Sequence, residues 1–218
     1  LDTSRGLGDV YKRQVLERLE DGDLDRRLLL LEWVRLLLER APLIEPLGLK
    51  DILLRRASDP VAEVANKVTL CLAKAIEADR DFGHQLALRL HEREETLVRR
   101  AMADVLTRLF RRLTWDALPL LDDMLTSDDE GVLAAASATV GDVKYLDKEQ
   151  WADRLRQLAD HPLAIVRRNL VPNLREYIEF DPADSRGLFH QLWKDGDEVV
   201  RTRLRESVSY THLTLPTT

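Results

Sequence analysis

The sequence predicts an all-α fold, an α-solenoid of about five to six helical hairpins with a period of 34 residues. A valine recurs at the same place in five successive segments of the chain. Apolar residues follow each valine at the spacing of one helix face, and the alternation typical of strands is missing. The repeat therefore organises the chain more than any single motif does.

The valine column sets the period. Its members are 34 residues apart: Val64, Val98, Val132, Val166 and Val200. Four residues after each valine stand Val68, Met102, Ala136, Leu170 and Leu204, and eight residues after the first four stand Leu72, Leu106, Val140 and Leu174. Leu30, Val34 and Leu38 continue the pattern one period earlier. Spacing at i, i+4 and i+8 predicts one buried face of a helix in each repeat.

A second set of apolar columns predicts another helix upstream in each repeat. These columns are Leu90, Met124, Leu158 and Leu192, and Ala87, Leu121, Leu155 and Phe189. We expect helices over 81–91 and 96–112, and then over 115–126 and 130–143. Turn-forming residues stand in the joints, namely Asp59-Pro60, Ser127-Asp128-Asp129, His161-Pro162, Asp181-Pro182 and Asp195-Gly196. Pro172 lies inside a helical pattern, so we expect a kink there.

The two ends of the chain differ from the Arg-, Leu- and Glu-rich sequence between them. DVYKRQ at 9–14 can be encoded by a DNA string whose reverse complement, read in a shifted frame, encodes VSYTH at 208–212. Both ends resemble translated adapters of the transposon used in DNA sequencing. We therefore expect residues 1–14 and 208–218 to be adapter-derived, disordered or non-native segments. Residues 15–207 are then a solenoid from a longer, bacterial-type protein.

Composition narrows the classes of partner and setting. The net charge is −6, an acidic balance that disfavours nucleic acid or an anionic membrane as partner. No apolar run reaches the ~18 residues of a membrane span, because Glu32 and Arg35 interrupt the longest one. The single cysteine, Cys71, has no disulfide partner and no metal-binding residue at suitable spacing. We expect a reduced, cytoplasmic setting.

The turns between the two helices of each repeat resemble those of the HEAT-repeat, or armadillo-like, α-solenoid family. An Asp or Asp-Pro turn leads into Val-Arg, and the resemblance covers about 59–207 well and 15–58 loosely. Tetratricopeptide repeats, which share the period, would need Gly, Tyr, Ala and Pro columns that this sequence lacks.

The resemblance implies that the turn aspartate and the arginine after the valine pair across successive repeats. Asp59 and Asp195 are in phase, and Asp128 and Asp160 are one residue out of phase. Ala65 and Leu133 replace the arginine in two repeats, so the ladder is expected to be interrupted.

Six arginines recur at one place in the repeat and form the candidate partner-binding ridge. They are Arg99, Arg100, Arg167, Arg168, Arg201 and Arg203. One interpretation is a track for acidic peptides, phosphates or nucleic acid. In the other, the first arginine of each pair belongs to the ladder and the second is solvated or salt-bridged. We expect a non-catalytic scaffold that binds a protein or peptide partner on its concave face, formed by the second helices.

The sequence predicts no catalytic residue, no cofactor and no bound metal. His91-Glu92 is similar to the His-Glu pairs of the HEAT-fold deoxyhypusine hydroxylase, but that site needs several such pairs. A nucleic-acid-binding protein related to DNA glycosylases for alkylated bases is the alternative, and a sensor or spacer arm of a larger enzyme is a third possibility. The glycosylase resemblance would require concave Trp and Asp residues. The candidates are Trp33, Trp115, Trp151 and Trp193, with Asp116 and Asp153. We expect Trp33 and Trp193 to fill the core instead.

Overall fold

A computed structural model describes residues 3–20 and 22–211, with side chains for 10–20 and 22–208. Residues 1–2 and 212–218, the outer parts of the predicted adapter segments, lie outside this range. Residues 3–14 and 208–211 are helical and continue their neighbouring helices. The chain divides into two compact units, Leu1–Ala117 and Leu118–Thr218, and each is described by itself.

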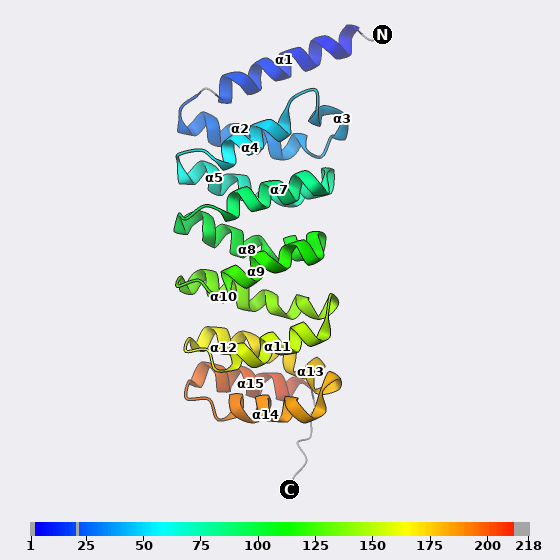
Figure 1. The fold of residues 1–218 in the computed structure, drawn as a ribbon. Coiled ribbons are helices and arrows are strands. Elements are labelled where there is room, and N and C mark those ends of the chain that lie inside the picture. Colours follow the sequence, from blue (N-terminus) through cyan, green and yellow to red (C-terminus); the bar gives the residue numbers. More distant parts are fainter. Residues whose placement is uncertain (1–2, 21, 212–218) are drawn as a thin grey trace. The chain divides into compact units, whose positions relative to one another are not determined.

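Unit 1 contains three helical hairpins in its described part (Figure 1). Its helices are α1 (Thr3–Glu20), α2 (Leu24–Leu37), α3 (Ala41–Ile44), α4 (Leu49–Ala57), α5 (Ala62–Thr69), α6 (Leu72–Ala78), α7 (Arg80–His91), α8 (Thr96–Leu113) and η1 (Thr114–Ala117). The hairpins are α1 with α2, α4 with α5, and α7 with α8. The second helices α2, α5 and α8 pack successively against one another, and the first helix α4 packs against α7.

Unit 2 contains three further hairpins over 118–211. Its helices are α9 (Leu118–Met124), α10 (Glu130–Thr139), η2 (Val140–Tyr145), α11 (Lys148–Ala159), α12 (Ala164–Leu170), η3 (Val171–Asn173), α13 (Leu174–Phe180), α14 (Pro182–Trp193) and α15 (Glu198–Thr211). The second helices α10, α12 and α15 pack in succession, as do the first helices α11 and α14. This pattern of neighbour contacts confirms the all-α solenoid.

Pro172 interrupts the second helix of its hairpin, as the sequence predicted. The short 3₁₀ turn η3 separates α12 from α13, with Pro172 in its middle. Proline has no backbone N–H and crowds the carbonyl four residues earlier, so the α-helix cannot continue through it.

The predicted columns form the core. All five column valines are fully buried. The prediction for the tryptophans was wrong, because Trp33 and Trp193 are 47% and 40% exposed. Trp151 on α11 is the buried one, with its ring centroid 5.6 Å from that of Tyr177 in an edge-to-face arrangement. Whether a ring is covered depends on the helices beside it, and sequence alone does not reveal those neighbours.

Asp59, in the turn before α5, is a buried centre of hydrogen bonds in unit 1. Its carboxylate accepts from Arg27 Nη1 at 2.6 Å, from Arg56 Nη1 at 2.8 Å and from the backbone N–H of Val61 at 3.0 Å. Its carbonyl accepts from Arg93 Nη1 at 2.9 Å. Arg27 and Arg93 come from the preceding and following hairpins, so this turn links three repeats.

Asp195, in the turn before α15, has the same role in unit 2. Arg167 on α12 donates to both of its carboxylate oxygens, from Nε at 2.7 Å and from Nη2 at 2.8 Å. The hydrogen bond from Arg167 lowers the pKa of Asp195. This is the ladder pair that the resemblance implied. Asp59 is also paired with an arginine of the preceding hairpin. This arginine, Arg27, lies one helical turn before the repeat position that Arg167 occupies.

We predict opposite effects of alanine at two helical glycines. A Cβ at Gly83 on α7 would lie 2.6 Å from the Cα of Ile76, so Gly83→Ala should lower the free energy of unfolding by about 1–3 kcal/mol. A Cβ at Gly187 on α14 meets nothing within 4 Å, and Gly187→Ala should raise it by about 0.5–1 kcal/mol. Urea denaturation followed by circular dichroism measures both. Stabilisation by Gly83→Ala would contradict the close packing of α6 on α7.

We also predict that Asp195→Ala destabilises unit 2 by about 3 kcal/mol, because it leaves the largely buried Arg167 without its carboxylate. Asp128→Ala is the matched control: Asp128 occupies the corresponding turn of another hairpin and its side chain is exposed. Asp128→Ala should lower the free energy of unfolding by no more than about 0.5 kcal/mol. Chemical denaturation compares the two variants, and equal losses would show that the turn pair does not hold the hairpins together.

Candidate functional site

Two of the six ridge arginines have a structural role. Arg167 donates to the carbonyl of His161 at 2.6 Å as well as to Asp195. Arg201 makes the corresponding bond, six residues back, to the carbonyl of Asp195. Both guanidinium groups therefore close the turn that precedes their own helix.

Two other ridge arginines, Arg168 and Arg203, lie together at the surface of unit 2. They line a hollow of about 350 Å³ between α12 and α15, together with Val199 and Glu198. Arg203 is 3.7 Å from Glu206 on its own helix. For Arg168, no carboxylate lies within ion-pair distance over residues 10–20 and 22–208. Arg99 and Arg100 belong to unit 1, where they lie in the first turns of α8.

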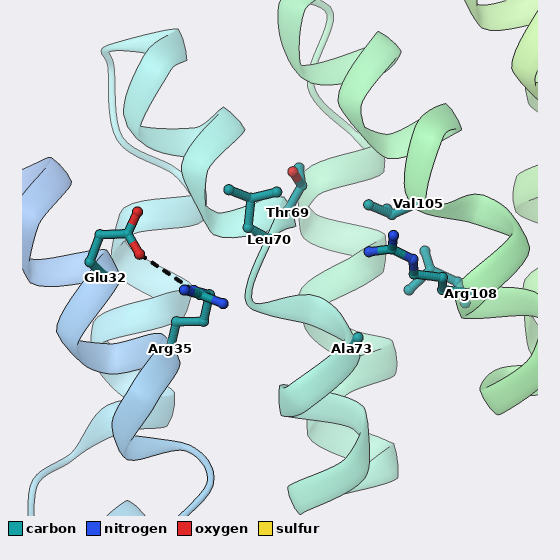
Figure 2. A pocket seen from close by; sticks show the side chains of 8 residues that line it. Glu32, Arg35, Thr69, Leu70, Ala73, Val105 and Arg108 are labelled. Atoms are coloured by element: carbon teal, nitrogen blue, oxygen red, sulfur yellow. Dashed lines mark hydrogen bonds and ion pairs between the residues drawn. The ribbon is translucent and has the colours of Figure 1, made fainter.

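A second hollow, of about 320 Å³, lies on the second-helix face of unit 1 (Figure 2). The residues that line it come from α2, from the end of α5 and the start of α6, and from α8. They are Glu32, Arg35, Thr69, Leu70, Ala73, Val105, Arg108 and Leu109. Leu70 is 52% exposed at its floor. Figure 2 shows Glu32 and Arg35 on one side of the hollow and Arg108 on the other.

Charges on the two sides of this hollow differ. Glu32 accepts a hydrogen bond from Arg35 Nε at 3.4 Å and forms an ion pair with Lys67. The hydrogen bond from Lys67 lowers the pKa of Glu32, so this carboxylate is ionised and already paired at neutral pH. Arg108 has no carboxylate within ion-pair distance in the part of the chain whose side chains are described. The hollow thus carries one uncompensated guanidinium beside aliphatic side chains.

A second ladder, which the sequence columns did not reveal, pairs four cations of unit 1 with glutamates. A glutamate of one hairpin pairs with a cation 35 residues later, in the next hairpin. The pairs are Glu20–Arg55, Glu32–Lys67, Glu39–Lys74 and Glu77–Arg112. A search for opposite charges one period plus one residue apart would have found it.

Both aspartates considered for a glycosylase-like site form ion pairs. Asp116 pairs with Arg80, and Asp153 pairs with Arg156. Trp151 is buried. Over the described residues, no group of three His, Cys, Asp or Glu side chains is placed to hold a metal ion. None of the described helices combines the length and apolar character needed to cross a bilayer.

Cys71 is buried, and its thiol donates weakly to the carbonyl of Leu31 at 3.8 Å. Burial raises the pKa of the thiol to about 12, because the thiolate would lose its hydration. The reactive, ionised form is therefore suppressed at physiological pH.

Several solved structures with the same fold are designed proteins. A designed armadillo repeat protein in complex with the peptide (KR)4 matches with a TM-score of 0.59 and 14% identity, over 90% of this chain and 98% of that one. Computationally designed armadillo repeat proteins for modular peptide recognition match with a TM-score of 0.57 and 16% identity, over 90% and 98%. An engineered protein matches with a TM-score of 0.56 and 16% identity, over 91% and 96%. At such identities the likeness shows the fold alone.

No protein-family model and no curated protein matches the chain.

For Cys71 we predict slow modification in the folded protein. Because the raised pKa keeps the thiol protonated and burial blocks access, iodoacetamide at pH 8 should react at least about 100-fold more slowly than with the urea-unfolded chain. Mass spectrometry of timed samples measures the two rates. Comparable rates would mean that the α2–α5 packing around Cys71 opens readily.

Proposed function

We propose that this protein is a non-catalytic scaffold that binds a segment of a partner protein along its second helices. Residues 15–207 carry this activity in our proposal, the terminal segments are adapter-derived, and the setting is cytoplasmic. The fold suits the task, because a solenoid presents an extended row of side chains rather than one closed pocket.

The observation that carries the proposal is the composition of the two hollows. Each lies between successive second helices and combines an arginine with an exposed aliphatic side chain, Arg108 with Leu70 and Arg168 with Val199. Neither arginine has an ion pair with the residues whose side chains are described. Exposed apolar side chains beside a charged group that can form hydrogen bonds are typical of surfaces that bind peptides.

The comparisons support the same proposal without assigning a ligand. One matching designed protein was solved in complex with a peptide, and others were designed for modular peptide recognition. This chain differs from them in most of its residues, so its ligand must be deduced from its own side chains. The nucleic-acid alternative fits the two hollows less well, because the acidic side chains Glu32 and Glu198 line them and would repel phosphates.

We predict that selection from a displayed library of random 12-residue peptides yields ligands for the second-helix face. The double variant Arg108→Glu/Arg168→Glu should weaken the selected peptides at least about tenfold, as expected for loss of charge-assisted hydrogen bonds. Fluorescence anisotropy measures the affinities.

The matched control is Arg89→Glu/Arg186→Glu. It makes the same change in net charge on the exposed surface of first helices α7 and α14, and it should bind like the parent. Equal weakening by both variants, or a library that yields no ligand, would contradict the proposal. Retention on DNA-cellulose at 150 mM salt that is lost only in the first variant would favour nucleic acid instead.

A further inference from the structure

We infer that each hollow is a subsite for an acidic side chain followed by an aliphatic one, so that the partner segment is an extended peptide of alternating acidic-aliphatic character. This inference rests on the proposed function and specifies its ligand. The side chains that line the hollow of each unit support it independently.

In unit 1 the charge ladder pairs several cations near the hollow but leaves Arg108 without a carboxylate among the residues described. Lys67, Lys74 and Arg112 on the second helices each pair with a glutamate of the preceding hairpin. Arg108, which lies one turn before Arg112 and in the wall of the hollow, has no such pair among the residues described. The guanidinium is exposed and free to take a carboxylate from outside, in the bidentate geometry that arginine favours.

The apolar floor beside Arg108 selects the second side chain. Leu70 is half-exposed, and Ala73, Val105 and Leu109 surround the same space of about 320 Å³. This lining offers no hydroxyl other than that of Thr69. A branched aliphatic side chain placed there would remove apolar surface from water on both partners, at roughly 25 cal/mol per Å².

The hollow of unit 2 has an arginine, an aliphatic side chain and a paired glutamate in common with that of unit 1, and it also contains Thr202, Arg203 and Glu206. Arg168 takes the place of Arg108, and Val199, 53% exposed, takes the place of Leu70. Glu198 pairs with Arg201 and, at 3.0 Å, with Arg205, just as Glu32 pairs with Lys67 and Arg35. The hydrogen bond from Arg201 lowers the pKa of Glu198, which is therefore ionised at neutral pH.

The paired glutamate in each hollow disfavours a polyanion as the ligand. A nucleic-acid backbone carries a charge at every residue and would bring phosphates against Glu32 and Glu198 as well as onto the arginines. A single carboxylate with a neutral neighbour can reach the arginine and leave the glutamate in its ion pairs. A basic peptide would have to compete with Lys67 or Arg201 for the glutamate and would leave the arginine repelled.

The test uses three fluorescein-labelled octapeptides. In an extended peptide alternate side chains lie on one face, so ESVSESVS presents Glu and Val together. KSVSKSVS reverses the charge, and ESSSESSS removes the aliphatic side chain. We expect ESVSESVS to bind at least about tenfold more tightly than either comparison peptide. KSVSKSVS cannot form the charge-assisted hydrogen bond to arginine, and ESSSESSS has no valine to bury.

Variants then assign the binding to the hollows. Arg108→Glu/Arg168→Glu should reduce the affinity for ESVSESVS at least about tenfold. The control Arg111→Glu/Arg186→Glu, at exposed arginines outside the two hollows, should leave it unchanged. Leu70→Ser/Val199→Ser should weaken ESVSESVS but not ESSSESSS, and Leu88→Ser on first helix α7 should weaken neither. Circular dichroism confirms that each variant is folded.

Tighter binding of KSVSKSVS, or ESVSESVS binding that the two arginine reversals leave intact, would overturn the inference. If library-selected peptides bind the second-helix face while ESVSESVS does not, the ligand class is wrong and the proposed function stands. If no peptide of either kind binds, both are wrong.

Discussion

The structure depends on a buried carboxylate in the turn between two helices. Asp59 and Asp195 occupy the same position of the repeat, and each accepts an arginine from the hairpin before it. A hairpin of two short helices cannot bury its faces alone, so its orientation on its neighbour must be set by something more directional than apolar contact. A hydrogen-bonded ion pair at the turn supplies that direction, and the valine columns then pack in register.

The core helices and one of the two turn pairs could be predicted from the sequence, because the same residue types recur at the same positions of successive repeats. Valines at 64, 98, 132, 166 and 200 identified the core helices, and all are buried. The pairing of Asp195 with Arg167 followed from the turn motif. By contrast, the arginine of the preceding hairpin that donates to Asp59 is Arg27, in a hairpin where the motif is degenerate. This arginine stands at another position of its repeat than Arg167 does, and a comparison of repeat positions cannot detect such a pair.

The binding face was harder to predict than the fold. Recurrence marked six arginines alike, but the structure separates them by partner: Arg167 and Arg201 close turns, whereas Arg168 faces a hollow. Exposure of Trp33 and Trp193 escaped prediction for a similar reason. Whether a side chain is covered depends on the neighbouring hairpin, and a periodic pattern contains no information about which neighbour is missing a complementary group.

The ladder of unit 1 has a fixed polarity. In all four pairs the carboxylate belongs to the earlier hairpin and the cation to the later one. Within this ladder each hairpin presents its acid to its successor and its base to its predecessor, whereas the turn pair of Arg27 with Asp59 has the opposite order. The four pairs stand at four different places of the repeat, so each junction between hairpins carries its own set of charges. Electrostatics of this kind fixes the order of the hairpins, because a hairpin moved to another place in the array would lose its partners.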